Sequence, residues 1–223
     1  MKHDLFFYRR LFEIIPAFLS WWIIILLVIL SIMHPVAGAV ALIVYEIYWM
    51  VRTFYLTALL GLAHYRLNQE RERNWLADCH KEKEGCVDRI TDIYHAVIFT
   101  VYKESVEILA SSLNALLATN YPKDKMLVVM AFEEREPLAG EKAGFLEKEY
   151  GDKFFYYLST FHPDGLPGEA RLKGANATWA GRRLKEFIDR RRLPYETITV
   201  SCFDADTCVD KEYFSCLTFH FLT

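Results

Sequence analysis

Long apolar runs fill the first third of the chain, and shorter apolar runs separated by polar turns fill the rest. The stretch 14–33, IIPAFLSWWIIILLVILSIM, carries no charge and has about the 20 residues that a helix needs to cross a bilayer. His34-Pro35 interrupts this run, and a second apolar run follows over 36–62. A signal peptide would have a shorter apolar region. The pattern therefore predicts a two-helix transmembrane hairpin over residues 1–65.

Basic residues flank the hairpin on one side only. The turn at His34 has no Lys or Arg, whereas basic residues precede the first span and follow the second, namely Lys2, Arg9, Arg10, Arg52, Arg66, Arg71 and Arg73. By the positive-inside rule, both ends of the hairpin are expected in the cytoplasm. The chain is thus predicted to be a multi-pass integral membrane protein with its soluble part on the cytoplasmic side of the cell membrane. The charged segment 66–93 is predicted to be a connector at the membrane surface.

Beyond this connector, apolar runs of strand length alternate with helical patterns. Strands are predicted at 95–101, 125–132, 153–161 and 196–203, and helices at about 105–119, 140–150, 177–192 and 213–221. Alternation of this kind indicates an α/β domain with a doubly wound, mostly parallel sheet. We expect it to span residues 94–223. A Pro- and Gly-rich loop is predicted at 162–168.

Composition and charge narrow the function. The chain is 53% hydrophobic with a formal net charge of -3, and binding to a phosphate backbone normally needs a concentrated basic face. No nucleic-acid partner is therefore expected. The five cysteines are odd in number and lack a Cys-x2-Cys zinc spacing, so we interpret them as reduced thiols.

Polar residues follow three of the predicted strands. They are Tyr102-Lys103-Glu104, Glu133-Glu134-Arg135 and Asp204-Ala205-Asp206. In parallel sheets, ligands bind beyond the carboxyl ends of the strands. In an extended chain, Asp204 and Asp206 would point the same way, and two carboxylates suit Mg²⁺ or Mn²⁺. The alternative is that the pair caps a helix or a turn. The absence of Gly-x-Gly-x-x-Gly and of a P-loop argues against a dinucleotide enzyme or a P-loop nucleotidase.

Taken in order, four pieces of the soluble part resemble a family 2 glycosyltransferase with a GT-A fold, anchored by an N-terminal transmembrane hairpin as in membrane polysaccharide synthases. The pieces are Thr100-Val101-Tyr102-Lys103-Glu104, where the family usually has Pro-x-Tyr-x-Glu, then LLATNYPKDKMLVVMAFEE, then Arg171-Leu172-Lys173-Gly174-Ala175-Asn176, and then Asp204-Ala205-Asp206. The resemblance covers about residues 95–223.

The resemblance implies a donor site at these residues. Tyr102 and Glu104 would line the base and ribose pocket, although Tyr102 could instead pack and Glu104 begin a helix. Glu133, or its neighbour Glu134, would contact the base, with a solvated turn as the alternative.

The remaining pieces would hold the diphosphate and a cation. Lys173, Gly174 and Asn176 would lie along the diphosphate, and helix initiation is the competing interpretation for all three. Asp204 would contact the ribose or the sugar, and Asp206 would bind a divalent cation, Mg²⁺ or Mn²⁺, that bridges the phosphates and stabilises the departing nucleotide.

The function implied is transfer of a hexose, with inversion, from a UDP- or GDP-sugar to a lipid or glycan acceptor. The aspartate that these enzymes use as general base, and the Gln-x-x-Arg-Trp segment of membrane synthases, would lie beyond Thr223. Asp210 and Glu212 are expected to open the last helix. The chain is therefore expected to be a fragment, a truncated reading frame or a donor-binding half. Two alternatives are a non-catalytic membrane module that binds nucleotide or a synthase partner, and a nucleotidyltransferase of related fold.

Overall fold

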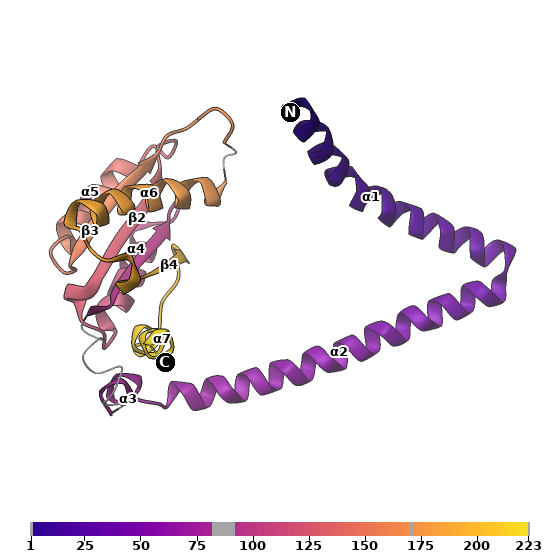
Figure 1. The fold of residues 1–223 in the computed structure, drawn as a ribbon, viewed down its shortest axis with the longest axis horizontal. Helices are drawn as coiled ribbons and strands as arrows, with labels where there is room; N and C mark the ends of the chain where they lie inside the picture. Colours follow the sequence, from indigo (N-terminus) through magenta and orange to yellow (C-terminus); the bar gives the residue numbers. More distant parts are fainter. Residues whose placement is uncertain (1, 82–91, 170–171, 223) are drawn as a thin grey trace. The chain divides into compact units, whose positions relative to one another are not determined.

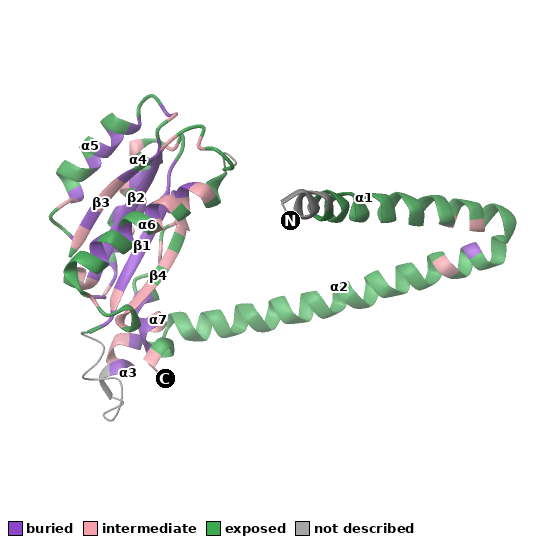
Figure 2. Cartoon of the chain, turned by 45° about the horizontal axis from the view of Figure 1, so that its top comes forward, coloured by how far each residue is buried: buried purple, intermediate pink, exposed green. Residues whose placement is uncertain are grey.

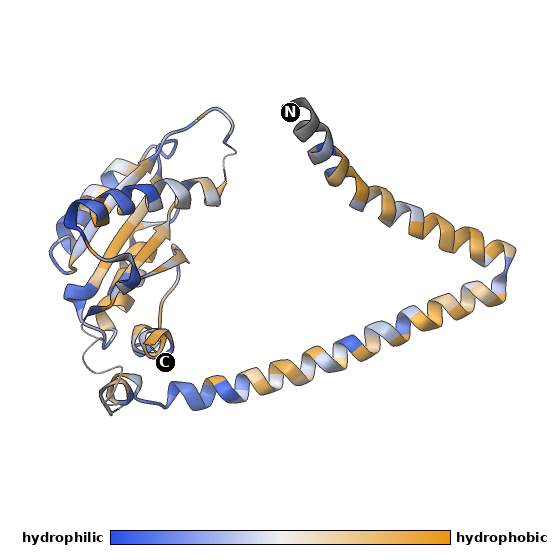
Figure 3. Cartoon of the chain, in the orientation of Figure 1, coloured by the Kyte–Doolittle hydropathy of each residue, from blue (hydrophilic) through white to orange (hydrophobic). Residues whose placement is uncertain are grey.

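The computed structural model describes residues 2–81, 92–169 and 172–222 and divides into two units, Met1–Glu72 and Arg73–Thr223. Unit 1 consists of α1 (Lys2–Met33) and α2 (Pro35–Arg71). Both helices are long and apolar enough to cross a membrane (Figure 3). The side chains that the structure describes in them are exposed almost throughout (Figure 2). This agrees with the two predicted spans. The sidedness and the depth of these helices in a bilayer stay predictions.

The two helices of unit 1 approach each other closely at Gly38. A Cβ atom at this position would lie 2.6 Å from Ser31 Oγ and 2.8 Å from Ser31 Cα. Only a residue without a side chain fits there, as is common where membrane helices pack. His34 lies between the helices, and Pro35 begins α2, because proline is well tolerated in the first turn of a helix.

Unit 2 is an α/β domain with helices on both faces of a four-stranded parallel sheet (Figure 1). The strand order is β3-β2-β1-β4. The strands are β1 (Tyr94–Thr100), β2 (Met126–Glu133), β3 (Tyr156–His162) and β4 (Ile198–Asp204). The helices are α3 (Trp75–Lys81), α4 (Val106–Ala118), α5 (Ala139–Tyr150), α6 (Lys173–Arg191) and α7 (Tyr213–Leu222), with short 3-10 turns η2 (Lys123–Lys125) and η3 (Tyr195–Thr197). The predicted fold class is confirmed.

Two hydrophobic clusters hold the helices against the sheet. On one face, alternate residues of β1 and β2 pack with α4, α5 and α7, and on the other face they pack with α6. Trp75 of α3 is 2% exposed and its ring lies 5.2 Å from that of Phe219 in α7. The segment predicted as a surface connector thus contributes a core residue to unit 2. Residues 82–91 of that segment, with Cys86, lie outside the described residues. The four cysteines within the described residues form no disulfide bond.

The most deeply buried polar residue of β1 is His95. His95 is 1% exposed, and its Nδ1 and Nε2 atoms lie 2.6 Å from Thr199 Oγ1 and 2.7 Å from Thr218 Oγ1. The rings of Tyr121 and Phe214 enclose it. Burial disfavours the imidazolium ion and lowers the pKa of His95 to about 3. His95 is therefore a neutral part of the core.

The register of the sheet decides which residues meet at its carboxyl edge. Thr100 at the end of β1 lies opposite Ala131 in β2 and opposite Asp204 in β4. Because all four strands run in the same direction, the turns that follow β1, β2 and β4 lie at one edge. The three polar turns noted in the sequence are thereby brought together.

Candidate functional site

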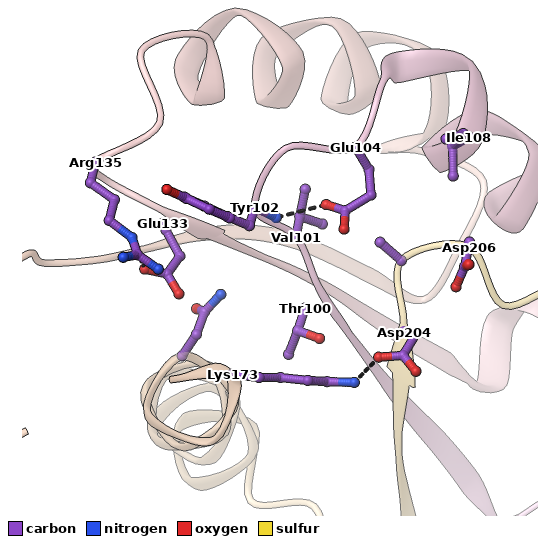
Figure 4. Close-up of a pocket in the computed structure, with 12 residues that line it drawn as sticks. Thr100, Val101, Tyr102, Glu104, Ile108, Glu133, Arg135, Lys173, Asp204 and Asp206 are labelled. Carbon is purple, nitrogen blue, oxygen red and sulfur yellow. Dashed lines mark hydrogen bonds and ion pairs between the residues drawn. The ribbon is translucent and has the colours of Figure 1, made fainter. Parts of the chain in front are cut away.

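A pocket of about 430 Å³ lies at this edge. Four segments line it, namely the end of β1 with the turn before α4, the end of β2 with its following turn, the first turn of α6 and the tip of β4 (Figure 4). The lining residues are Thr100, Val101, Tyr102, Glu104, Ile108, Glu133, Arg135, Lys173, Asn176, Asp204, Ala205 and Asp206. Seven of the eight residues predicted as donor or metal ligands line this pocket, and Gly174 does not. Their binding functions stay predictions.

Asp204 and Asp206 reach the pocket by a different geometry from the one expected. The sequence argument placed both on an extended chain. In the structure, Asp204 ends β4, and the backbone N–H of Thr207 donates to the carbonyl of Asp204 at 3.0 Å, which closes a turn. The carbonyl of buried Ala205 accepts a hydrogen bond from Ser112 Oγ of α4 at 2.7 Å. The turn is thus fixed to α4, and both aspartates line the pocket.

Carboxylate oxygens are ligands that suit a divalent cation whose remaining ligands come from a bound molecule and water. Within residues 2–81, 92–169 and 172–222, no group of three or more His, Cys, Asp or Glu side chains is arranged to hold a metal ion. A closed protein cage is therefore not present in the described part. One or two carboxylates combined with phosphate oxygens and water is the usual coordination of Mg²⁺.

Glu104 fixes the turn that follows β1. Its Oε2 atom accepts hydrogen bonds from the backbone N–H groups of Tyr102 at 2.7 Å and Lys103 at 3.1 Å. The N-cap of α4 is Ser105 and the helix begins at Val106, so Glu104 precedes the helix and does not begin it. Glu104 also lines the pocket, so it shapes the turn and presents a carboxylate at the same time.

Behind this turn lies a buried ion pair. Lys142 of α5 pairs with Glu136, and their side chains are 10% and 7% exposed. The ammonium group of Lys142 also donates to the carbonyl of Glu104 at 2.6 Å. The pair therefore ties α5 to the turn that carries the pocket residues.

Arg135 is a pocket residue that was not among the predicted ligands. Its guanidinium lies 4.3 Å from the ring centroid of Tyr102, and its Nε lies 2.7 Å from Oε2 of Glu133. Glu133 is the last residue of β2 and is 6% exposed. Arg135 thus holds a buried carboxylate in place and covers an aromatic ring (Figure 4). Its position in the polar turn after β2 was the available signal.

The first turn of α6 completes the pocket. The helix was expected to start at 177, but it begins at Lys173. The prediction missed the first turn because this turn carries no apolar pattern. Asn176 is 2% exposed and donates from Nδ2 to the carbonyl of Ala131 at 2.7 Å. Helix initiation, the competing interpretation of Lys173, Gly174 and Asn176, is thus observed. The backbone N–H groups of a helix N-terminus favour an anion.

The pocket is acidic overall. Four carboxylates line it, from Glu104, Glu133, Asp204 and Asp206, against two basic side chains, Arg135 and Lys173. A nucleoside diphosphate would add about three further negative charges if its phosphates are largely ionised at neutral pH. Repulsion would oppose its entry unless a cation accompanied it. The charge balance therefore favours a cation in the pocket and disfavours an anion that enters alone.

Among known proteins, similarity to this chain is found in solved structures. No family model matches the chain, and no curated protein matches it. One solved structure, a mannosyltransferase from Pyrobaculum calidifontis in complex with GDP-mannose and Mn²⁺, is 18% identical, with a TM-score of 0.38. The match covers 56% of this chain and 31% of the mannosyltransferase chain. A likeness of this size carries no argument about function. The fold is defined here by the strand pairing, and the site by the residues that line the pocket.

Proposed function

We propose that the chain is a membrane-anchored glycosyltransferase of the family 2, GT-A type that binds a nucleotide-sugar donor in the pocket at the carboxyl edge of the sheet. The convergence of the predicted donor residues supports this proposal, because seven residues from four separate segments line a single pocket. The donor is a UDP- or GDP-hexose, the acceptor is a lipid or a glycan, and the transfer inverts the anomeric centre.

Each residue has a role that follows from its chemistry. Tyr102, with Arg135 stacked on it, forms the wall against which the base lies. The Glu133 carboxylate, held by Arg135, accepts hydrogen bonds from N–H groups of the base. Glu104 keeps the turn beneath the ribose in place through its bonds to the backbone.

The opposite side of the pocket receives the diphosphate. Lys173 and the N-terminus of α6 contact its oxygens, Asp204 contacts the ribose or the sugar, and Asp206 holds the cation. A divalent cation at this place would stabilise the charge that develops on the departing nucleoside diphosphate. The two helices of unit 1 would anchor the domain to a bilayer, with the pocket on the cytoplasmic side.

The test is nucleotide binding to the purified chain, measured by titration calorimetry with UDP and GDP, in Mn²⁺ and in EDTA. Asp206→Ala is compared with Asp152→Ala, a matched change at an exposed position remote from the pocket. In Mn²⁺ we expect Asp206→Ala to weaken binding by about tenfold or more, the value of a charge-assisted contact. In EDTA the same variant should bind no more weakly than the wild type, because it lacks one repelling carboxylate.

The control variant Asp152→Ala should match the wild type in both conditions. Equal affinity of wild type and Asp206→Ala in Mn²⁺ would contradict the assignment of Asp206. If neither nucleotide binds in Mn²⁺, the donor site itself is wrong.

A further inference from the structure

Lys173 and Asp204 contact each other across the mouth of the pocket. Lys173 is the first residue of α6 and Asp204 the last of β4, and the Lys173 ammonium forms an ion pair with Oδ1 of Asp204 (Figure 4). The side chains are 51% and 68% exposed, so solvent and ligands reach both groups. The ammonium thus neutralises one of the two aspartates that would face a divalent cation.

The helix that carries Lys173 is fixed at its start. Asn176, three residues further on, is 2% exposed, and its Nδ2 holds the carbonyl of Ala131 at 2.7 Å. A change of partner by Lys173 therefore requires only rotation of its flexible side chain and no movement of α6. The other end of the Asn176 amide, Oδ1, is buried without a hydrogen-bond partner in the described part of the chain.

A divalent cation held by Asp206 and an ammonium group paired with Asp204 would lie at the same pocket and repel each other. The released Lys173 would then be left beside the N-terminus of α6. Phosphate oxygens of a ligand bound at that N-terminus would be the anionic partner within reach of the Lys173 ammonium. Lys173 therefore opposes the cation when the pocket holds no nucleotide and supports the nucleotide when it is present.

We propose that Lys173 is a positioning residue that exchanges partners, pairing with Asp204 in the empty pocket and with the phosphates when nucleotide and cation bind together. This inference rests on the proposed function of the pocket. Its consequence is that the cation alone binds weakly and binds well only with the nucleotide. The site is thereby kept from filling with metal ion before the donor arrives.

The experiment measures two affinities of the 223-residue chain. Binding of Mn²⁺ alone is followed by the electron paramagnetic resonance signal of free Mn²⁺, and binding of GDP and UDP is followed by calorimetry at saturating Mn²⁺. The variants are Lys173→Met, Lys173→Arg and the control Lys185→Met. Lys185 also lies in α6 and also pairs with an aspartate, Asp189, but it does not line the pocket.

For Lys173→Met we expect effects of opposite sign. Mn²⁺ alone should bind about threefold more tightly, which matches loss of an exposed ion pair, while nucleotide should bind about tenfold more weakly, which matches loss of a charged hydrogen bond. In an Asp204→Asn background, Lys173→Met should no longer improve Mn²⁺ binding. Lys173→Arg should retain the competition, and Lys185→Met should behave as wild type.

The outcomes separate the exchange from the proposed function. Equal Mn²⁺ affinity in wild type and Lys173→Met, or weaker binding in the variant, overturns the exchange even if nucleotide binding depends on Asp206. Absence of nucleotide binding by the wild type in Mn²⁺ overturns the proposed function and the exchange together. An improvement that persists in the Asp204→Asn background overturns the role of Asp204 as the shared partner.

Discussion

Acidification is expected to destabilise unit 2 through His95. The pKa of this residue is lowered by burial to about 3, against an ordinary value of 6.5. Between these values the unfolded chain takes up a proton that the folded chain does not, so the contribution of neutral His95 is fully present above the unfolded pKa and is lost as the pH falls below it. At about pH 5, some 1.5 units below the unfolded pKa, the loss is about 2 kcal/mol, since each unit is worth about 1.4 kcal/mol.

The loss can be measured by urea unfolding of the purified chain at about pH 7.5 and about pH 5, followed by tryptophan fluorescence. Trp75 and Trp179 lie in unit 2, and Trp75 is fully packed. The control variant is His95→Gln, which keeps polar atoms for the two threonine hydroxyls but does not titrate. Wild type should lose about 2 kcal/mol more than His95→Gln between the two pH values.

The result that refutes this reasoning is a parallel loss in the two proteins. It would mean that His95 is protonated as readily in the folded chain as in the unfolded one. The threonine contacts and the surrounding aromatic rings would then not exclude the imidazolium ion.

Two further substitutions test the packing. Gly38→Val should lower the thermal stability of the helical hairpin in detergent, because the new Cβ would meet the backbone of Ser31. Gly61→Val should be tolerated, because no heavy atom outside the neighbouring helix backbone lies within 4 Å of a Cβ at that position. Equal effects of the two substitutions would argue against the close approach at Gly38. Lys142→Met should reduce the free energy of unfolding in urea by about 3–5 kcal/mol, because it leaves the Glu136 carboxylate buried and unpaired; Lys142→Met with Glu136→Leu should recover much of this loss, and no recovery would show that the pair is not the cause.

Much of the fold could be predicted because apolar periodicity determines it. β1 and β2 are nearly continuous apolar runs, as expected of strands buried on both faces, and they are buried almost throughout. The predicted bounds of all four strands differ by only a few residues from those observed. The start of α6 was missed because apolar periodicity is absent there. Its first turn from Lys173 carries few apolar residues, so hydrophobic periodicity could not reveal it.

The pocket could be predicted as a set of residues but not as a geometry. The polar turns after β1, β2 and β4 were visible in the sequence, and a parallel sheet places them at one edge. The contacts among them were not visible, because they depend on side-chain reach. The stacking of Arg135 on Tyr102 and the ion pair of Lys173 with Asp204 join residues far apart in sequence. His95 is similar, since its neutral state depends on Thr199 and Thr218.

The pairing of Thr100 with both Ala131 and Asp204 has a consequence for changes in chain length. Side chains alternate between the two faces of a sheet, so inserting or deleting a single residue within β4 would turn every later side chain of the strand to the opposite face. Asp204 would leave the pocket although no pocket residue had been substituted. We expect the segment between β3 and α6 to accept added residues readily, whereas β4 should accept none.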